Sequence, residues 1–236
     1  MELLKLISDK NKKKVVVHID PDKYTDQSVL ELIEVSEKCK ISFFLIGSSL
    51  VSKNVDHVIQ VIKSRTRIPV ILFPGSLLQI SLQADGILLL SLISGRNPEY
   101  LIGNHIIAAT FLKKSNLEII PTGYILVENG HTTSVEYVSN TKPIPSDKKE
   151  IAVATAIAGE MLGLKLIYLE GGSGADHHVP LEMIKEVKKN ISIPLIVGGG
   201  IRTSRQIKDI FEAGANVVVI GNVIEKNPQL LSNLLK

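Results

Sequence analysis

The chain has 236 residues, of which 44% are hydrophobic, 22% charged and only 4% aromatic, with no tryptophan and a formal net charge of +3. This length suits one large α/β domain over residues 1–236, and the small net charge argues against a nucleic-acid-binding protein. The single cysteine, Cys39, excludes an intrachain disulfide and the multi-cysteine zinc patterns.

The N-terminal segment and the longest apolar runs bear on location. Residues 1–14 carry charges on both sides of a short apolar stretch and lack the features of a signal peptide. The run at 86–94 is too short to span a bilayer. We therefore expect a cytoplasmic protein. The lysines at 12–14 form either a solvated segment or a contact for an anionic membrane surface.

Eight short apolar runs, typical of strands buried on both faces, recur along the chain. The predicted strands are 15–19, 43–47, 69–73, 86–90, 118–126, 165–170, 194–198 and 217–221. Stretches with apolar residues three and four apart predict helices at 28–40, 54–64, 147–163, 180–190 and 204–214.

The alternation of strands and helices predicts a parallel α/β fold. Eight strands favour a (β/α)8 TIM barrel over an open doubly wound sheet. Residues 74–85, between the third and fourth strands, are too few for a full crossover helix, so the third helix should be shortened or replaced. Residues 128–147 are polar and should form a surface excursion after the fifth strand.

Glycine-rich segments follow the last strands. In TIM barrels the active site lies at the carboxyl ends of the strands, and phosphates commonly bind after strands seven and eight. GGGIRTS (198–204) precedes a predicted helix, and GN (221–222) ends the eighth strand. Backbone N–H groups in such loops can hold a phosphate. The alternative is a tight turn without a ligand.

The segment DPDK (20–23) follows the first strand. Asp20 at a barrel mouth is a natural Mg²⁺ ligand, and Ser48 or Ser49 could add a hydroxyl oxygen. The alternative is a solvated Asx-type turn. Residues 176–178 (DHH) are adjacent to one another on one loop elsewhere in the chain. They lack a zinc-binding spacing, so no zinc site is expected.

Seven segments occur in order along nearly the whole chain: HIDPDK (18–23), IGSS (46–49), SLISGRNPEYLIG (91–103), GYILVENG (123–130), YLEGGSGA (168–175), VGGGIRT (197–203) and VIGN (219–222). As a set they resemble the geranylgeranylglyceryl phosphate synthase family, which includes the heptaprenylglyceryl phosphate synthases. TGYILVENG (122–130) and PIPSDKKEIA (143–152) resemble its second subgroup.

The resemblance implies a modified TIM barrel and a prenyltransferase. A long prenyl group, geranylgeranyl for this subgroup, would pass from its diphosphate to the C3 hydroxyl of sn-glycerol 1-phosphate and give an ether-lipid precursor. It also implies a homo-oligomer, either a dimer or a hexamer. The small-molecule partners would be sn-glycerol 1-phosphate and a polyprenyl diphosphate, with Mg²⁺ as cofactor.

Site residues follow from the resemblance position by position. Asp20 and Ser49 match the Mg²⁺ ligands. Some relatives carry a lysine near His18 that helps hold the glycerol phosphate, which leaves Lys23 and Arg202 as candidates to replace that contact. The positions that match the glycerol phosphate site are Tyr168, Leu169, Glu170, Gly171, Gly172, Ser173, Gly174, Gly199, Gly200, Gly221 and Asn222.

Glu170 stands just before GGSG, where a carboxylate would repel a phosphate. If the phosphate binds after strands seven and eight, the other end of the glycerol points back toward strand six. There Glu170 would accept the hydroxyl proton as general base. The alternative is a structural carboxylate that accepts loop N–H bonds. Tyr168 would line the prenyl path or bind the glycerol.

The prenyl chain needs an apolar groove, for which residues 73–79 and 91–101 are candidates, with Tyr100 and Tyr124 as gates or stops. Two other classes remain open. One is a phosphosugar enzyme on the same barrel, although the predicted strand interiors lack the Schiff-base lysine of an aldolase. The other is a non-catalytic phosphate-binding barrel.

Overall fold

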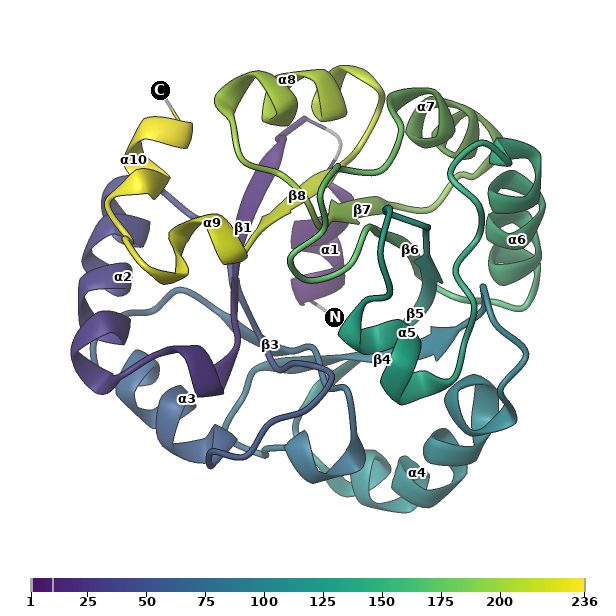
Figure 1. Ribbon diagram of the computed structural model, residues 1–236. Helices are drawn as coiled ribbons and strands as arrows, with labels where there is room; N and C mark the ends of the chain where they lie inside the picture. The colour runs from purple at the N-terminus through teal and green to yellow at the C-terminus, as the bar shows by residue number, and fades with distance from the viewer. Residues whose placement is uncertain (1, 10, 236) are drawn as a thin grey trace.

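Eight parallel strands close into a barrel, and helices surround it (Figure 1). The computed structural model describes residues 2–9 and 11–235, so Met1, Lys10 and Lys236 of the expected domain lie outside the described residues. The strands follow one another around the barrel in chain order, and the last pairs with the first. The predicted TIM barrel is confirmed.

All eight predicted strands are present, within a few residues of the predicted bounds. They are β1 (Lys14–Ile19), β2 (Phe44–Ile46), β3 (Val70–Leu72), β4 (Gly86–Leu92), β5 (Glu118–Leu126), β6 (Leu166–Glu170), β7 (Leu195–Gly198) and β8 (Val217–Ile220). The segment between β3 and β4 holds only the 3-10 turn η2 (Leu77–Gln79). The expectation of a replaced third helix is therefore confirmed.

The five predicted helices are present as α2 (Asp26–Lys38), α3 (Val55–Lys63), α6 (Lys149–Met161), α7 (Leu181–Asn190) and α8 (Ser204–Glu212). Further helices lie outside those predictions: α1 (Glu2–Ser8), α4 (Asn104–Lys114), α5 (Ser134–Ser139), α9 (Asn222–Glu225) and α10 (Leu230–Leu234). Two short turns complete the chain, η1 (Pro21–Lys23) and the π-helical η3 (Glu99–Gly103). The polar excursion at 128–147 contains α5.

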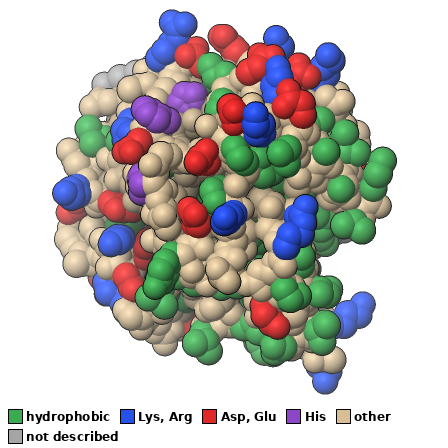
Figure 2. All heavy atoms as spheres, turned by 45° about the vertical axis from the view of Figure 1, so that its right-hand side comes forward, with side chains coloured by type: hydrophobic (Ala, Val, Ile, Leu, Met, Phe, Trp, Pro, Cys, Tyr) green, Lys and Arg blue, Asp and Glu red, His purple; other side chains and the backbone are tan. Residues whose placement is uncertain are grey.

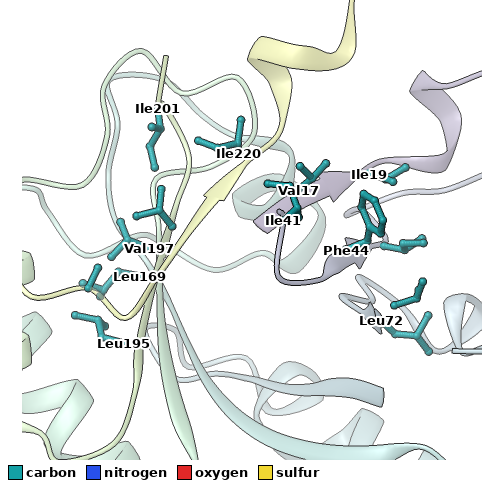
Figure 3. Close-up of a cluster of buried hydrophobic side chains, with 14 of the residues drawn as sticks. Val17, Ile19, Ile41, Phe44, Leu72, Leu169, Leu195, Val197, Ile201 and Ile220 are labelled. Carbon is teal, nitrogen blue, oxygen red and sulfur yellow. The ribbon is translucent and has the colours of Figure 1, made fainter. Parts of the chain in front are cut away.

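The core has two layers because successive strand residues point to opposite faces of the barrel wall. Side chains inside the barrel include Val16, Leu88 and Tyr168. The other layer packs between the strands and the surrounding helices, and Figure 3 shows part of it, with Leu169 and Ile220 among its side chains. Both layers are largely aliphatic.

The amino-terminal end of the barrel is closed by α1. Leu3 and Ile7 of this helix are buried among the inward-facing residues. The Glu118 carboxylate at the start of β5 accepts hydrogen bonds from the Leu3 and Leu4 N–H groups at 2.9 and 2.8 Å, and so satisfies the first turn of α1. The opposite end, where the strands finish, therefore remains to form a site.

The surface carries charges of both signs with hydrophobic side chains between them (Figure 2). Large exposed hydrophobic residues include Ile106, Ile107 and Phe111 on α4 and Met161 on α6. Among the residues that the structure describes, no helix is long and apolar enough to cross a membrane.

Candidate active site

A polar cavity opens at the carboxyl ends of β6, β7 and β8. It is lined mainly by the loops that follow these strands, with His18 of β1 and the Ser48–Ser49 loop on its other side. The predicted residues that line it are Tyr168, Glu170, Gly172, Ser173, Gly174, Gly199, Gly200, Gly221 and Asn222, together with Ser49. The fold thus brings together most of the positions that the sequence marked.

The loop after β7 requires glycine. Gly199 has φ +85°, and a Cβ atom there would lie 2.5 Å from Oε1 of Glu170. Gly200 also has positive φ and packs against the backbone of His177. In the described chain, the N–H groups of Gly200 and Ile201 have no hydrogen-bond acceptor. Unpaired N–H groups in a cavity wall can bind an anion.

Asn222 joins the end of β8 to the loop after β6. Its Oδ1 accepts a hydrogen bond from Gly174 N–H at 2.9 Å, and its Nδ2 donates to Glu225 Oε1 at 2.9 Å. Glu225 thereby fixes the orientation of the amide. Glu225 is not among the residues predicted from the sequence, although its position three residues after Asn222 in a helix places the two on one face.

Asn129 also holds the loop after β6 in place. Asn129 is buried, and its Oδ1 accepts a hydrogen bond from His177 N–H at 2.7 Å, while its Nδ2 donates to His177 O. Arg202 donates to the carbonyls of Asp176 and Ala175 at 2.8 and 2.7 Å. Arg202 lines the cavity, but these bonds engage its guanidinium with the loop.

Glu170 is the last residue of β6 and is buried. Its Oε1 accepts a hydrogen bond from Gly172 N–H at 2.6 Å, and its carboxylate also accepts one from the Tyr168 hydroxyl. Burial raises the pKa of Glu170 to about 7, against the opposing effect of these hydrogen bonds. A carboxylate with a pKa near neutrality can accept a proton and release it again.

Two predicted substrate-binding positions lie away from the cavity lining. Leu169 points into the outer core layer (Figure 3), and Gly171 N–H donates to Gly198 O at 3.0 Å. Lys23 also lies outside the lining, at the exposed end of η1. His18 lines the cavity, and its Nε2 is 2.7 Å from Gly47 O.

The DPDK segment forms η1 beside the cavity. Asp20 lines neither this polar cavity nor the apolar cavity that adjoins it, which is described below. Its Oδ1 accepts a hydrogen bond from Asp22 N–H at 3.0 Å. The Asp22 carboxylate accepts from Ser52 N–H and Lys53 N–H, both at 2.9 Å, and from the Ser52 hydroxyl. Asp22 thereby ties the loop after β1 to the loop that carries Ser49.

Carboxylate and hydroxyl oxygens suit Mg²⁺. In the described part of the chain, Asp20 Oδ2 and the Ser49 hydroxyl form no hydrogen bond, so both are available as ligands. No cluster of three or more His, Cys, Asp or Glu side chains that could hold a metal ion occurs over residues 2–9 and 11–235.

A second, apolar cavity adjoins the polar one. It runs between β3, β4 and α4, and its lining includes Leu77, Ile87, Leu89 and Ala108. The two predicted groove segments, 73–79 and 91–101, both contribute to it, as do Tyr100 and Tyr124. The residues common to both cavities are Ser48, Ser49, Phe73, Tyr124 and Val135.

Fold and site together define a TIM-barrel protein with a small polar site, a buried carboxylate and an adjoining apolar cavity. This construction suits an enzyme that joins a small polar molecule to an apolar chain. Residues 8–236 match the PcrB family, and the chain belongs to this family.

Relatives agree with this assignment. The chain is 47% identical to a geranylgeranylglyceryl phosphate synthase of Spirosoma linguale over 235 residues, which are 99% of this chain and 94% of the relative. It is 44% identical to that of Pyrococcus furiosus, over 89% of this chain and 83% of the relative. These comparisons confirm the resemblance read from the sequence motifs.

A solved structure is similar over the same length. It is that of (S)-3-O-geranylgeranylglyceryl phosphate synthase from Thermoplasma acidophilum, in complex with its substrate sn-glycerol-1-phosphate. The TM-score is 0.91 and the sequence identity 33%, with 99% of this chain and 94% of the other covered.

Proposed function

We propose that this protein is a geranylgeranylglyceryl phosphate synthase, which transfers a geranylgeranyl group from its diphosphate to the C3 hydroxyl of sn-glycerol 1-phosphate. The observation that carries this proposal is the contact between two unlike cavities. A polar cavity with glycine-rich walls adjoins an apolar cavity. The residues that line both are Ser48, Ser49, Phe73, Tyr124 and Val135. A phosphosugar enzyme would need only the first cavity.

The acceptor fits the polar cavity in one direction. Its phosphate would bind the free N–H groups after β7 and the first turn of α9, because anions bind such groups. Its hydroxyl end would then point toward β6, where Glu170 lies. Glu170 would accept the proton of the C3 hydroxyl as general base, while Oε1 still holds the loop through Gly172 N–H.

The donor would lie across the shared wall, with its prenyl chain in the apolar cavity and its diphosphate near Ser48 and Ser49. We propose Asp20 and Ser49 as Mg²⁺ ligands, which agrees with the free oxygens of both side chains. When bound, Mg²⁺ would neutralise charge on the leaving diphosphate. Asp22 would position the two ligands through its bonds to the loop after β2.

The setting of the enzyme is also part of the proposal. We expect a cytoplasmic homo-oligomer, and the exposed Ile106, Ile107 and Phe111 on α4 offer an apolar surface for a contact between copies. A transient contact with a membrane surface would let the enzyme take up its prenyl donor and release its lipid product.

A direct test compares two acceptors. The protein is incubated with geranylgeranyl diphosphate and Mg²⁺, and with either sn-glycerol 1-phosphate or sn-glycerol 3-phosphate. We expect an ether product from the 1-phosphate and little from the 3-phosphate. Omission of Mg²⁺ should abolish the product. A folded protein that binds phosphate yet makes no ether with either acceptor would contradict the proposal.

A further inference from the structure

Aromatic side chains are scarce in this protein but gather at one place. The chain has five phenylalanines, five tyrosines and no tryptophan. Three of these ten rings, Phe73, Tyr124 and Tyr168, contact one another. Phe73 and Tyr168 stack with centroids 5.2 Å apart and an interplanar angle of 14°. Tyr124 lies 5.7 Å from Phe73 and 5.4 Å from Tyr168.

These three rings occupy the junction of the two cavities. Phe73 and Tyr124 line both, and Tyr168 lines the polar one. Phe73 directly follows β3, and Tyr124 and Tyr168 each lie two residues before the end of β5 and β6. All three pack in the interior of the barrel, where branched aliphatic residues are usual. The other side chains inside the barrel are mostly branched aliphatic, such as Leu45, Ile71 and Ile196, with Phe43 as the exception.

In the proposed reaction the allylic carbon passes through this junction. The C1–O bond to the diphosphate breaks, and the diphosphate leaves with the electron pair. The glycerol oxygen forms the new C1–O bond and gives its proton to Glu170. Positive charge therefore develops on the allylic group before the new bond is complete, and it develops between the two cavities.

We propose that Phe73, Tyr124 and Tyr168 form an aromatic wall whose π faces stabilise the positive charge on the allylic group during prenyl transfer. This inference rests on the proposed function. The face of an aromatic ring attracts a cation, and more strongly where water is excluded. Phe73 is the clearest case, because its side chain has no polar atom that could act in another way.

The two tyrosines suit this role as neutral phenols. Burial raises the pKa of Tyr124 and of Tyr168 well above 10, and the nearby Glu170 carboxylate raises both further. A phenolate at the junction would compete with the glycerol oxygen for the allylic group. Neutral rings stabilise the charge without attacking it.

The experiment replaces Phe73 with mono-, di- and trifluorophenylalanine in the full chain. Fluorine withdraws charge from the ring face but changes its size little. We expect the single-turnover rate of ether formation to fall stepwise with each fluorine, roughly two- to thirtyfold in all. The affinity for a non-hydrolysable thiodiphosphate analogue of the donor should stay unchanged.

A matched control is the same series at Phe43, which is buried inside the barrel and lines neither cavity. We expect no graded change in rate there. A flat series at Phe73, or an equal fall at Phe43, would overturn the inference while leaving the proposed function intact. If the unmodified protein made no ether product at all, the proposed function would fail, and this inference with it.

Discussion

Replacement of Glu170 by glutamine tests the centre of the proposed mechanism. The glutamine side chain keeps the size of the original and an oxygen that can accept the Gly172 N–H bond, so the loop should stay in place. Its amide cannot accept the hydroxyl proton. Loss of a positioned general base costs about 10²–10⁴ in rate. We therefore expect turnover to fall by that order with the fold intact.

The same change should alter how stability depends on pH. Burial raises the Glu170 pKa from 4.5 to about 7, so the folded state binds the proton more tightly than the unfolded state. The free energy of unfolding of the wild type is then highest at low pH and decreases as pH rises through this window. At about 1.4 kcal/mol per pKa unit, the full effect is roughly 3 kcal/mol.

The variant lacks this titration. Relative to the wild type, Glu170→Gln should gain roughly 2.5 kcal/mol in free energy of unfolding between pH 5 and pH 9. Urea titrations at several pH values measure it, and Glu128→Gln, at an exposed carboxylate after β5, is the matched control. In the wild type, kcat should rise with pH and level off above about 7. Near-normal turnover in the variant, or parallel stability curves, would refute the reasoning.

Three further changes test the rest of the site. Asp22→Asn should raise the apparent KM for Mg²⁺ about tenfold while kcat at saturating Mg²⁺ stays near normal. The reason is that the hydrogen bonds from Ser52 and Lys53, which position the loop, become weaker when the carboxylate is lost. An equal loss of activity at every Mg²⁺ concentration would contradict this. Gly199→Ala should abolish acceptor binding measured by calorimetry, since the new Cβ atom would collide with the Glu170 carboxylate. The control is Gly163→Ala, where φ is similar but the space around the Cβ atom is open. That change should lower the free energy of unfolding by only about 1–2 kcal/mol. Ala108→Phe should block geranylgeranyl diphosphate but still admit geranyl diphosphate in product assays, and the exposed Ala109→Phe should change neither.

Much of the fold could be predicted because its determinants are local. The strands are buried on both faces, so each reads as a continuous apolar run, and β5 matches its predicted bounds, 118–126. Helices α2, α3, α7 and α8 each have one polar face and show the expected spacing. The strand ends carry glycine and acidic residues whose convergence follows from the parallel order of a barrel.

The parts that escaped prediction lack such a local pattern. Helix α4 exposes Ile106, Ile107 and Phe111 while burying Ala108 and Leu112, so apolar residues surround it and no periodicity marks it. Helix α1 has seven residues, too few for a periodic signal, and its role in closing the barrel depends on contacts with β5.

Some residues of the site could likewise be predicted from the sequence and others could not. Glu170 and the glycine segments could be identified from residue type and order along the chain. The support from Asn129 could not, because its partner His177 is 48 residues away in the sequence. Glu225 lies only three residues from its partner Asn222, but the loop that Asn222 holds, at Gly174, is 48 residues from Asn222, so its role also depends on the fold. The alternative role for Glu170, a carboxylate that holds the loop, is present together with a pKa suited to a base. One side chain can serve both because a carboxylate has two oxygens, and Oε1 is the one that holds Gly172 N–H.

The missing third helix connects fold to function most directly. In a regular TIM barrel a helix would cover the outer faces of β3 and β4, but here the segment between them forms only η2. The outward-facing Ile87 and Leu89 of β4 therefore line the apolar cavity. Apolar surface left without a covering helix costs about 25 cal/mol per Å² while it faces water. A long hydrocarbon ligand removes that cost when it binds, so the shortening that weakens one sector of the barrel is also what gives the donor its site.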